Sequence, residues 1–376
     1  MHINSVFDGG NIECISAREA GDIQLAIRRD NESDFYQWFY FRLTGAMDQA
    51  CKLNIVNAGD AAYPDGFNGY QAVASYDREH WFRVETTFDG SALTINHTPL
   101  ADSVYYAYFA PYTMERHFDL VHDALASPLV DSVCLGQTLD GQDLDLLRVG
   151  FPGENKRKFW FIARQHPGET MAEWWMEGFL DRLLDEDDPV SRELLKRAVF
   201  YVVPNMNPDG SRRGHLRTNA VGANLNREWI GATMARSPEV YLVRELMKEV
   251  GVDFFLDVHG DEALPYNFIA GAEGTASWND AKETRQKNFE KALMEASPDF
   301  QMEHGYERDA PKSANLAKAT DYVAETFGCL SMTLEMPFKD TIDSPNDIEG
   351  WSPERSRQLG RANLTALYSM RDQLDV

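Results

Sequence analysis

KRKFWFIARQHPGETMAEWWMEGFLDRLLDE, residues 156–186, contains the two patterns that decide the fold. Its first part, KRKFWFIAR, has a basic start and then a continuous apolar run, which is typical of a strand buried on both faces. Its last part, TMAEWWMEGFLDRLLDE, has the length and periodicity of a helix. A buried strand that leads through a short loop into a helix indicates an α/β fold.

Strands and helices alternate over the rest of the chain after residue 112. Thr113 is a candidate N-cap for the first helix, and Asp140-Gly141 predicts a turn between two early strands. This order predicts an α/β domain with a mixed, mostly parallel sheet covered by helices. The predicted elements are helices at residues 113–125, 237–251 and 352–374, and strands at residues 132–150, 198–210, 252–261 and 328–338.

Residues 1–112 have a different pattern, in which short aromatic and β-branched segments are separated by Gly, Asp and Asn. Asp89-Gly90 is expected to form the turn of a hairpin. Such spacing predicts an N-terminal antiparallel β-sandwich over residues 1–112, followed by an α/β domain over residues 113–376. The predicted strand segments are QWFYFRLTG (37–45), CKLNIVNAG (51–59), YQAVASYD (70–77), HWFRVETTFDGSALTINHT (80–98) and DSVYYAYFAPY (102–112).

The chain of 376 residues is strongly acidic, with 60 Asp and Glu against 36 Lys and Arg, a formal net charge of −24. This balance argues against nucleic acid as a partner, because phosphate binding needs clustered cations. No apolar run approaches the roughly 20 residues that a membrane span requires, and the first residues lack the pattern of a secretory signal. We therefore expect a cytoplasmic protein without a membrane partner; the oligomeric state is left open.

Four cysteines are far apart in the sequence and form no Cys-x-x-Cys pair. Their number and spacing suit a reducing compartment rather than a disulfide framework. We expect all four to be small buried apolar residues. They are Cys14, Cys51, Cys134 and Cys329.

The motif His-x-x-Glu occurs three times, so the motif alone carries little weight and its context must decide. The three pairs are His166–Glu169, His259–Glu262 and His304–Glu307. The last pair lies in a polar loop and is expected at the surface, and Glu262 is expected to be solvated rather than a ligand, although it could shape a pocket.

His166 and Glu169 have the most suggestive context, because they lie between a predicted strand and helix and enclose a Pro-Gly turn. His259 ends another predicted strand and supplies a third ligand, and Asp257 on the same strand face is placed to orient it. Two imidazoles and a carboxylate at strand ends fit a catalytic zinc with one open position. A single histidine is more often a hydrogen-bonded structural residue, so the zinc site is a hypothesis that needs all three ligands.

Two further segments supply candidate substrate-binding and catalytic residues. LRTNAVGANLNREW places Arg217, Asn226 and Arg227 in one loop, and such side chains bind a carboxylate or stabilise an oxyanion. The alternative is an ordinary loop with exposed cations. Glu335 lies inside the apolar segment SMTLEMPF, where burial would raise its pKa and suit it to proton transfer. The alternative is a glutamate that faces solvent from an edge strand.

Five motifs occur in a fixed order: RQHPGETMAEWWMEGFL, PNMNPDG, RTNAVGANLNREW, DVHGD and SMTLEMPF. Together they resemble the M14-type zinc carboxypeptidases, and in particular the cytosolic carboxypeptidase branch. The upstream segments QWFYFRLTG, FAPYTMERHFDLV and CLGQTLDGQDLDLLRVG resemble that branch as well, whose members carry a β-sandwich before the peptidase domain. The resemblance covers most of the chain and identifies residues 113–376 as the catalytic domain.

The resemblance implies a zinc-dependent carboxypeptidase, with one zinc ion per chain, that acts on the C-terminal tails of peptides or proteins. Arg217 would polarise the scissile carbonyl, and Asn226 and Arg227 would bind the terminal carboxylate. Glu335 would take a proton from the attacking water and pass it to the leaving amine. The implied zinc ligands are His166, Glu169 and His259.

Two features of the family do not align clearly with this chain. Members often have a tyrosine that closes over the substrate, and here Tyr306 and Tyr322 are both candidates. Lys312 and Lys318 are candidates for the residue that sets the terminal-residue preference, and a lysine there would favour a terminal Glu or Asp. The alternative is that both lysines lie at the surface.

Two other functions stay open at this point. One is an amidohydrolase of N-acyl amino acids that resembles aspartoacylase and succinylglutamate desuccinylase, against which PNMNPDG and the N-terminal segments argue. The other is a catalytically silent binding module on the same fold, against which the intact ligand set and Glu335 argue.

Overall fold

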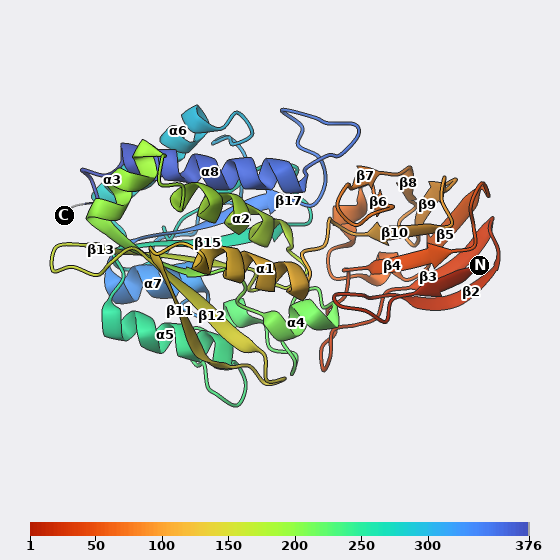
Figure 1. Cartoon of the computed structure of the whole chain (residues 1–376), viewed down its shortest axis with the longest axis horizontal. Coiled ribbons are helices and arrows are strands. Elements are labelled where there is room, and N and C mark those ends of the chain that lie inside the picture. Colours follow the sequence, from red (N-terminus) through yellow and green to blue (C-terminus); the bar gives the residue numbers. More distant parts are fainter. Residues whose placement is uncertain (375–376) are drawn as a thin grey trace.

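A computed structural model describes residues 1–374 of the chain. A β-rich part formed by the first residues lies at one end, and a larger α/β part formed by the rest lies at the other (Figure 1). Residues 375 and 376, the last two of the predicted second domain, lie outside the described residues. Within residues 1–374, no helix combines the length and the hydrophobicity that crossing a membrane requires.

The N-terminal part contains two five-stranded sheets, and the predicted antiparallel sheets are confirmed. The exception is the β3–β5 pair, which is parallel. The Asp89-Gly90 turn joins β8 to β9 as predicted, and Nδ1 of His97 contacts the hydroxyl of Tyr106 at 2.8 Å to link the two sheets. In sheet order the strands are β1 (His2–Asn4), β4 (Tyr40–Thr44), β10 (Ser103–Ala107), β6 (Val73–Ser75) and β7 (Phe82–Arg83), then β2 (Glu13–Glu19), β3 (Asp22–Ala26), β5 (Cys51–Ile55), β9 (Leu93–His97) and β8 (Thr86–Phe88).

The α/β part is built on one mixed seven-stranded sheet, as predicted. Its central strands β14, β13, β15 and β17 are parallel, and antiparallel strands extend the sheet on both sides. In sheet order the strands are β11 (Val130–Gln137), β12 (Asp143–Val149), β14 (Ala198–Val203), β13 (Arg157–Ala163), β15 (Phe254–Asp261), β17 (Leu330–Pro337) and β16 (Phe268–Ala270).

Helices cover both faces of this sheet (Figure 1). The side chains of Phe159 and Phe161 on β13 join the apolar cluster that contains α2 and α8, whereas Trp160 and Ile162 join the cluster that contains α5 and α7. Burial on both faces explains why this strand is a continuous apolar run. The helices are α1 (Met114–Leu125), α2 (Met171–Leu183), α3 (Pro189–Arg197), α4 (Pro208–Arg213), α5 (Pro238–Val250), α6 (Asp280–Ala296), α7 (Ala319–Phe327) and α8 (Pro353–Ser369).

The predicted helices and strands after residue 112 are present, and the side chain of Thr113 caps α1 as expected. The elements α3, α4, α6, α7 and β16 were not predicted. For α6 the reason is that the helix is polar and buries few apolar side chains. The prediction for the cysteines was half wrong, because Cys14 and Cys134 are exposed while Cys51 and Cys329 are buried. Cys14 and Cys134 lie on β2 and β11, which are edge strands.

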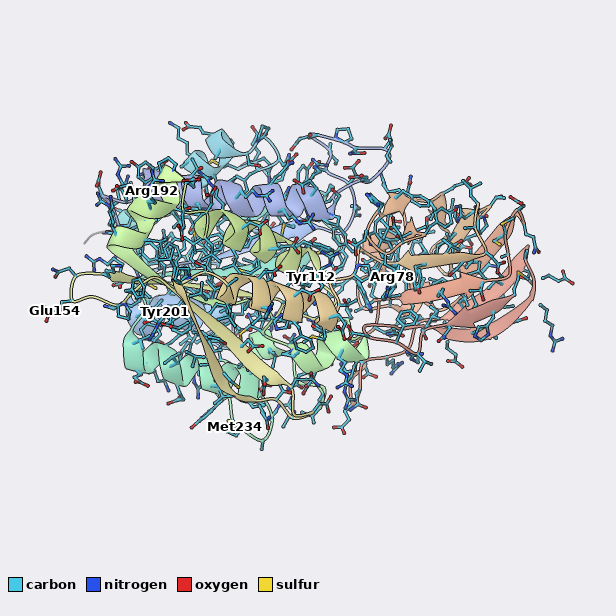
Figure 2. The ribbon with its side chains drawn as sticks, in the orientation of Figure 1. Arg78, Tyr112, Glu154, Arg192, Tyr201 and Met234 are labelled. Atoms are coloured by element: carbon cyan, nitrogen blue, oxygen red, sulfur yellow. The ribbon has the colours of Figure 1, made fainter. Side chains whose placement is uncertain are left out.

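The two parts of the chain meet along a broad junction. Arg78 and Tyr112 lie at this junction (Figure 2) and line a cavity of about 740 Å³ between the two parts. The carboxylate of Asp8 accepts a hydrogen bond of 2.6 Å from the backbone N–H of Met114, the first residue of α1. The N-terminal part is therefore in direct contact with the α/β part.

Candidate functional site

Three parallel strands deliver the candidate ligands and the candidate base to one edge of the sheet. His166 and Glu169 lie in the loop between β13 and α2, and His259 and Glu335 lie near the ends of β15 and β17. His259 and Glu335 are direct neighbours in the β15–β17 ladder. Because the carboxyl ends of parallel strands meet at one edge, four residues far apart in the sequence come together.

The three predicted metal ligands converge, and each offers a donor atom within 4.8 Å of the others. The carboxylate of Glu169 lies between the two imidazoles, with Oε1 at 2.7 Å from Nδ1 of His166 and Oε2 at 2.7 Å from Nδ1 of His259. All three side chains are buried. Two imidazole nitrogens and a carboxylate oxygen are a donor set that fits zinc.

Further polar residues lie against the outer nitrogens of both imidazoles. Asp257 Oδ2 lies 2.9 Å from Nε2 of His259, which confirms the predicted contact, and it accepts a hydrogen bond of 2.6 Å from Nε2 of Gln165. Nε2 of His166 lies 3.1 Å from Oδ1 of Asn224. Carboxylates and amides that hold the far nitrogen of a histidine are typical partners of metal-binding imidazoles.

The electrostatics of the three ligands differ. Burial and the charge of Arg217 lower the pKa of His166 to about 4, so its imidazole is neutral at pH 7. Burial disfavours the ionised form of Glu169 and by itself would raise its pKa. The two histidines outweigh this effect and hold the pKa below the ordinary value. Burial disfavours the protonated form of His259 and by itself would lower its pKa. The carboxylates of Asp257 and Glu169 outweigh this effect and raise the pKa well above the ordinary value. The site thus contains an ionised carboxylate and a neutral imidazole before any ion binds.

Glu335 is buried, with 7% of its surface exposed, and it faces the cavity at this edge of the sheet. Burial raises its pKa well above the ordinary value, opposed by His259 and reinforced by Glu169, Asp261 and Glu262. Its Oε2 has no hydrogen-bond partner among the described residues. A buried carboxylate with a free oxygen beside the ligand cluster is suited to exchange protons with a bound water molecule.

Glu262 is also buried, so the expectation that it is solvated was wrong. The reason is the N-terminal part, since a Cβ at Gly66 would lie only 2.7 Å from the backbone oxygen of Glu262. Burial and the charge of Glu169 raise the pKa of Glu262 to about 8. It lines the same cavity, and the idea that it shapes the pocket is consistent with this position.

A cavity of about 670 Å³ adjoins the ligand cluster and brings together the remaining candidate residues. Arg217, Asn226 and Arg227 line it on one side, with the last two in the short 3-10 turn Leu225–Arg227. Oδ1 of Asn226 accepts a hydrogen bond of 2.9 Å from the N–H of Ala319, the guanidinium of Arg227 donates to the carbonyl of Asn226 at 2.6 Å, and both residues line the cavity. These residues can therefore reach a ligand in the cavity.

Lys318 also lines the cavity, whereas the exposed Lys312 is not among the lining residues. Lys318 lies near the buried Asp321. Burial raises the pKa of the Asp321 carboxyl, and the positive charge of Lys318 lowers it in part. His304 and Glu307 are exposed, as expected, although both line the mouth of the cavity.

The structure distinguishes the two candidate tyrosines. Tyr322 packs against Trp229 in an apolar cluster, with ring centroids 5.9 Å apart. Tyr306 lies at the cavity, and its hydroxyl donates to Oδ2 of Asp261 at 2.7 Å or to Oε1 of Glu335 at 3.2 Å. No sequence pattern indicated Asp261, because nothing at the end of β15 marks its contact with Tyr306.

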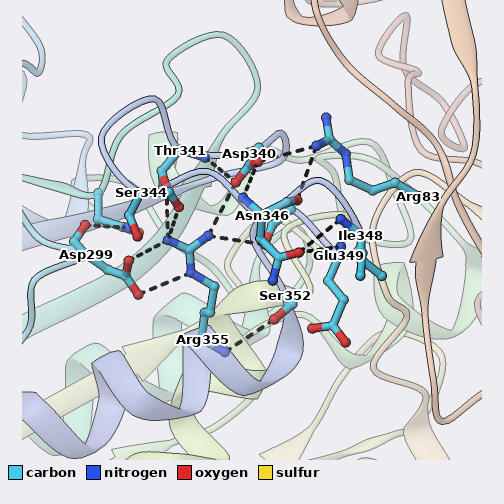
Figure 3. A network of polar contacts seen from close by, with 12 residues as sticks. Arg83, Asp299, Asp340, Thr341, Ser344, Asn346, Ile348, Glu349, Ser352 and Arg355 are labelled. Carbon is cyan, nitrogen blue, oxygen red and sulfur yellow. Dashed lines mark hydrogen bonds and ion pairs between the residues drawn. The ribbon is translucent and has the colours of Figure 1, made fainter.

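A polar network holds the loop that follows Glu335 and the start of the segment that carries Tyr306 (Figure 3). Arg355 on α8 donates to both oxygens of Asp299 and to Oδ1 of Asp340 at 3.3 Å. Arg83 from the N-terminal part donates to Oδ2 of the same Asp340 at 3.4 Å. Two arginines thus share one carboxylate, and the network joins α8, the N-terminal part and the loop after β17.

Comparison with known proteins gives matches over nearly the whole chain. The family model for the cytosolic carboxypeptidase N-terminal domain matches residues 3–109, and the family model for zinc carboxypeptidases matches residues 122–357. Cytosolic carboxypeptidase 6 of Caenorhabditis elegans is 25% identical over 396 residues, with 96% of this chain and 85% of that protein covered.

Two solved structures are similar over their full lengths. A metallo-carboxypeptidase from Burkholderia cenocepacia is 50% identical, with a TM-score of 0.97 and 99% of each chain covered. A metallo-carboxypeptidase from Pseudomonas aeruginosa, in complex with (2-guanidinoethylmercapto)succinic acid, is 46% identical, with a TM-score of 0.97 and 100% of each chain covered.

Proposed function

Because the chain belongs to the M14 zinc carboxypeptidase family, we propose that it removes C-terminal residues from peptides or proteins with one zinc ion held by His166, Glu169 and His259. The resemblance to the cytosolic carboxypeptidases is confirmed by the match of the N-terminal residues to their N-terminal domain. The observation that carries the proposal is the convergence of these three donors beside the buried Glu335.

The roles of the protein's own residues follow from their positions. A divalent cation held by the three ligands would act as a Lewis acid, activate a water molecule and favour the ionised form of Glu335. An oxygen of Glu335 takes the proton from the attacking water and delivers it to the nitrogen of the leaving amino acid. The guanidinium of Arg217 stabilises the oxyanion that develops on the scissile carbonyl.

Asn226 and Arg227 bind the terminal carboxylate of the substrate in this proposal, which restricts the enzyme to C-terminal residues. A planar guanidinium and an amide suit a carboxylate, and both residues lie at the cavity. The ligand of the P. aeruginosa relative, a succinic acid derivative, carries carboxylates of the kind that these residues would bind. Lys318 favours a terminal Glu or Asp in this proposal, because it is a cationic residue that lines the same cavity.

The proposal extends to the organisation of the chain. We assign residues 1–112 to a β-sandwich domain and residues 113–376 to the catalytic domain, which is supported by the ranges that the two family models match. The acidic composition and the names of the relatives support a cytoplasmic enzyme that acts on peptide or protein tails, with no nucleic-acid or membrane partner.

The proposal is tested with peptides that differ only in the last residue, assayed with and without a chelator. We expect chelator-sensitive release of single C-terminal residues by purified protein that contains about one zinc per chain. Glu335→Gln should keep the metal and lose hydrolysis by at least about 1,000-fold, because the buried base is removed while the ligands remain.

Two results would contradict this function. Hydrolysis that survives in Glu335→Gln would remove the proposed base from the reaction. Cleavage of N-acyl amino acids without cleavage of any peptide would favour the amidohydrolase alternative.

A further inference from the structure

Asp30 lies in the loop between β3 and β4 of the N-terminal part, and its side chain is 3% exposed. Both of its oxygens accept hydrogen bonds from the backbone segment that carries Arg217. Oδ1 accepts from the N–H of Leu216 at 2.7 Å, and Oδ2 accepts from the N–H groups of Arg217 at 2.8 Å and Thr218 at 2.9 Å. The hydroxyl of Thr218 adds a fourth bond at 3.1 Å.

Other contacts fasten the same two segments together. The N–H of Asn31 donates to Nε2 of His215 at 3.1 Å, and its side-chain amide donates to the carbonyl of Ala220 at 2.6 Å. Gly222 approaches the chain so closely that an added Cβ would lie 2.3 Å from the backbone oxygen of Glu32. The N-terminal part therefore helps to hold residues 215–222 in position.

The side chain of Arg217 is held from the same direction. The rings of Phe35 and Tyr63 lie against its guanidinium, with each ring centroid 5.5 Å from Cζ. Its buried Nε has no hydrogen-bond partner among the described residues. Aromatic rings hold an arginine without satisfying its donors, so the donors remain available to a ligand.

We infer that Asp30 is a positioning residue for Arg217, and that the N-terminal domain in this way takes part in building the catalytic site. The inference rests on the proposed role of Arg217 at the oxyanion. A carboxylate that accepts from three successive backbone N–H groups fixes their direction more firmly than a neutral acceptor does. A displacement of about 1 Å in a group that stabilises a transition state can reduce the rate about 100-fold.

Asp30→Asn tests the inference, because it keeps the shape of the side chain but places an amide N–H against backbone N–H donors. We expect kcat on a good peptide substrate to fall about 10- to 100-fold, with KM changed by less than about 3-fold. Asp34→Asn is the matched control, since Asp34 is in the same loop, is 95% exposed and, within residues 1–374, pairs only with Arg29. It should leave both constants unchanged.

A double-mutant comparison separates positioning from a general structural effect. In an Arg217→Met background, Asp30→Asn should add less than about a 3-fold loss, because the group that it positions is absent. An equal loss in both backgrounds would overturn the inference. If Asp30→Asn does not fold, Thr218→Val removes one of the four bonds, and its smaller loss in kcat should likewise vanish in the Arg217→Met background.

The outcome also distinguishes this inference from the proposed function. Wild-type protein that cleaves no peptide would overturn the function and the inference together. An active wild type with an unimpaired Asp30→Asn variant would overturn the inference alone.

Discussion

The hydroxyl of Tyr306 lies between two carboxylates, 2.7 Å from Oδ2 of Asp261 and 3.2 Å from Oε1 of Glu335. Tyr306 is half exposed, and its partial burial together with the charges of the two carboxylates raises its pKa, so the phenol keeps its proton at working pH. A phenol donates one hydrogen bond at a time. Asp261 can therefore hold Tyr306 at the cavity while Glu335 exchanges its proton with the substrate or water.

Tyr306→Phe should raise KM about 3- to 10-fold and change kcat less, because the hydroxyl is lost while the ring keeps its edge-to-face contact with Phe268. Steady-state kinetics with a blocked dipeptide measure both constants. A fall in kcat at constant KM would instead place the hydroxyl in the transition state.

Metal removal should abolish activity and lower the melting temperature. A bound ion at about 100 times its dissociation constant stabilises the folded chain by about 2.7 kcal/mol, so its removal is visible in calorimetry. His259→Ala should give protein without metal. His304→Ala is the control, since His304 belongs to the same His-x-x-Glu motif but is exposed, and it should keep the full metal content. Loss of metal in His304→Ala would show that the ligand assignment is incomplete.

The carboxylates around His117 lead us to expect that the folded chain loses stability at alkaline pH. Its Nδ1 lies 2.6 Å from Oε1 of the buried Glu173, and its Nε2 lies 3.5 Å from Oδ2 of Asp145. Burial opposes the charge on His117, but the two carboxylates outweigh it and raise the pKa to about 9 from an ordinary value of 6.5. Because the pKa is higher in the folded than in the unfolded chain, protonated His117 contributes its full stabilisation below about pH 6.5. The free energy of unfolding then falls by about 1.4 kcal/mol per pH unit up to about pH 9.

We therefore expect the apparent melting temperature to fall between pH 6.5 and 9 more steeply in the wild type than in His117→Gln. Differential scanning fluorimetry across this range measures both slopes. His122→Gln is the control on the same helix, because His122 is exposed. Equal slopes in the wild type and His117→Gln would show that His117 does not carry the effect.

The sequence predicted those parts of the site that local patterns encode. A strand that leads into a helix through a His-Pro-Gly-Glu loop places His166 and Glu169, and an apolar strand with one carboxylate marks Glu335. Glu262 was misread because a loop residue with polar neighbours is normally exposed, whereas here Gly66 of the N-terminal part packs closely against it. Such contacts join distant parts of the chain and leave no periodicity in either part.

The same limit applies to Asp30. It lies in a polar loop of the N-terminal part, where an aspartate usually forms a turn, and its partners are backbone N–H groups that carry no sequence signal. The sequence could therefore suggest Arg217 as a functional residue but could not predict what holds it in place.

The position of Lys318 leads us to expect a preference for an acidic residue at the C-terminus of the substrate. Lys318 lines the cavity, but the neighbouring Asp321 offsets part of its charge. We expect Lys318→Met to lower kcat/KM about 10-fold for a peptide that ends in Glu, because about 1.4 kcal/mol of attraction is lost in a partly buried site. A peptide that ends in Leu should be affected much less.

Lys312→Met is the matched control for this prediction, since Lys312 is exposed and lies outside the lining of the cavity. It should leave the ratio of the two kcat/KM values unchanged, whereas Lys318→Met should shift that ratio toward the peptide that ends in Leu. Equal losses on both peptides would mean that Lys318 supports the cavity without recognising a side chain. A preference for terminal Glu that persists in Lys318→Met would assign the recognition to another cation of the cavity, of which Arg308 is a candidate.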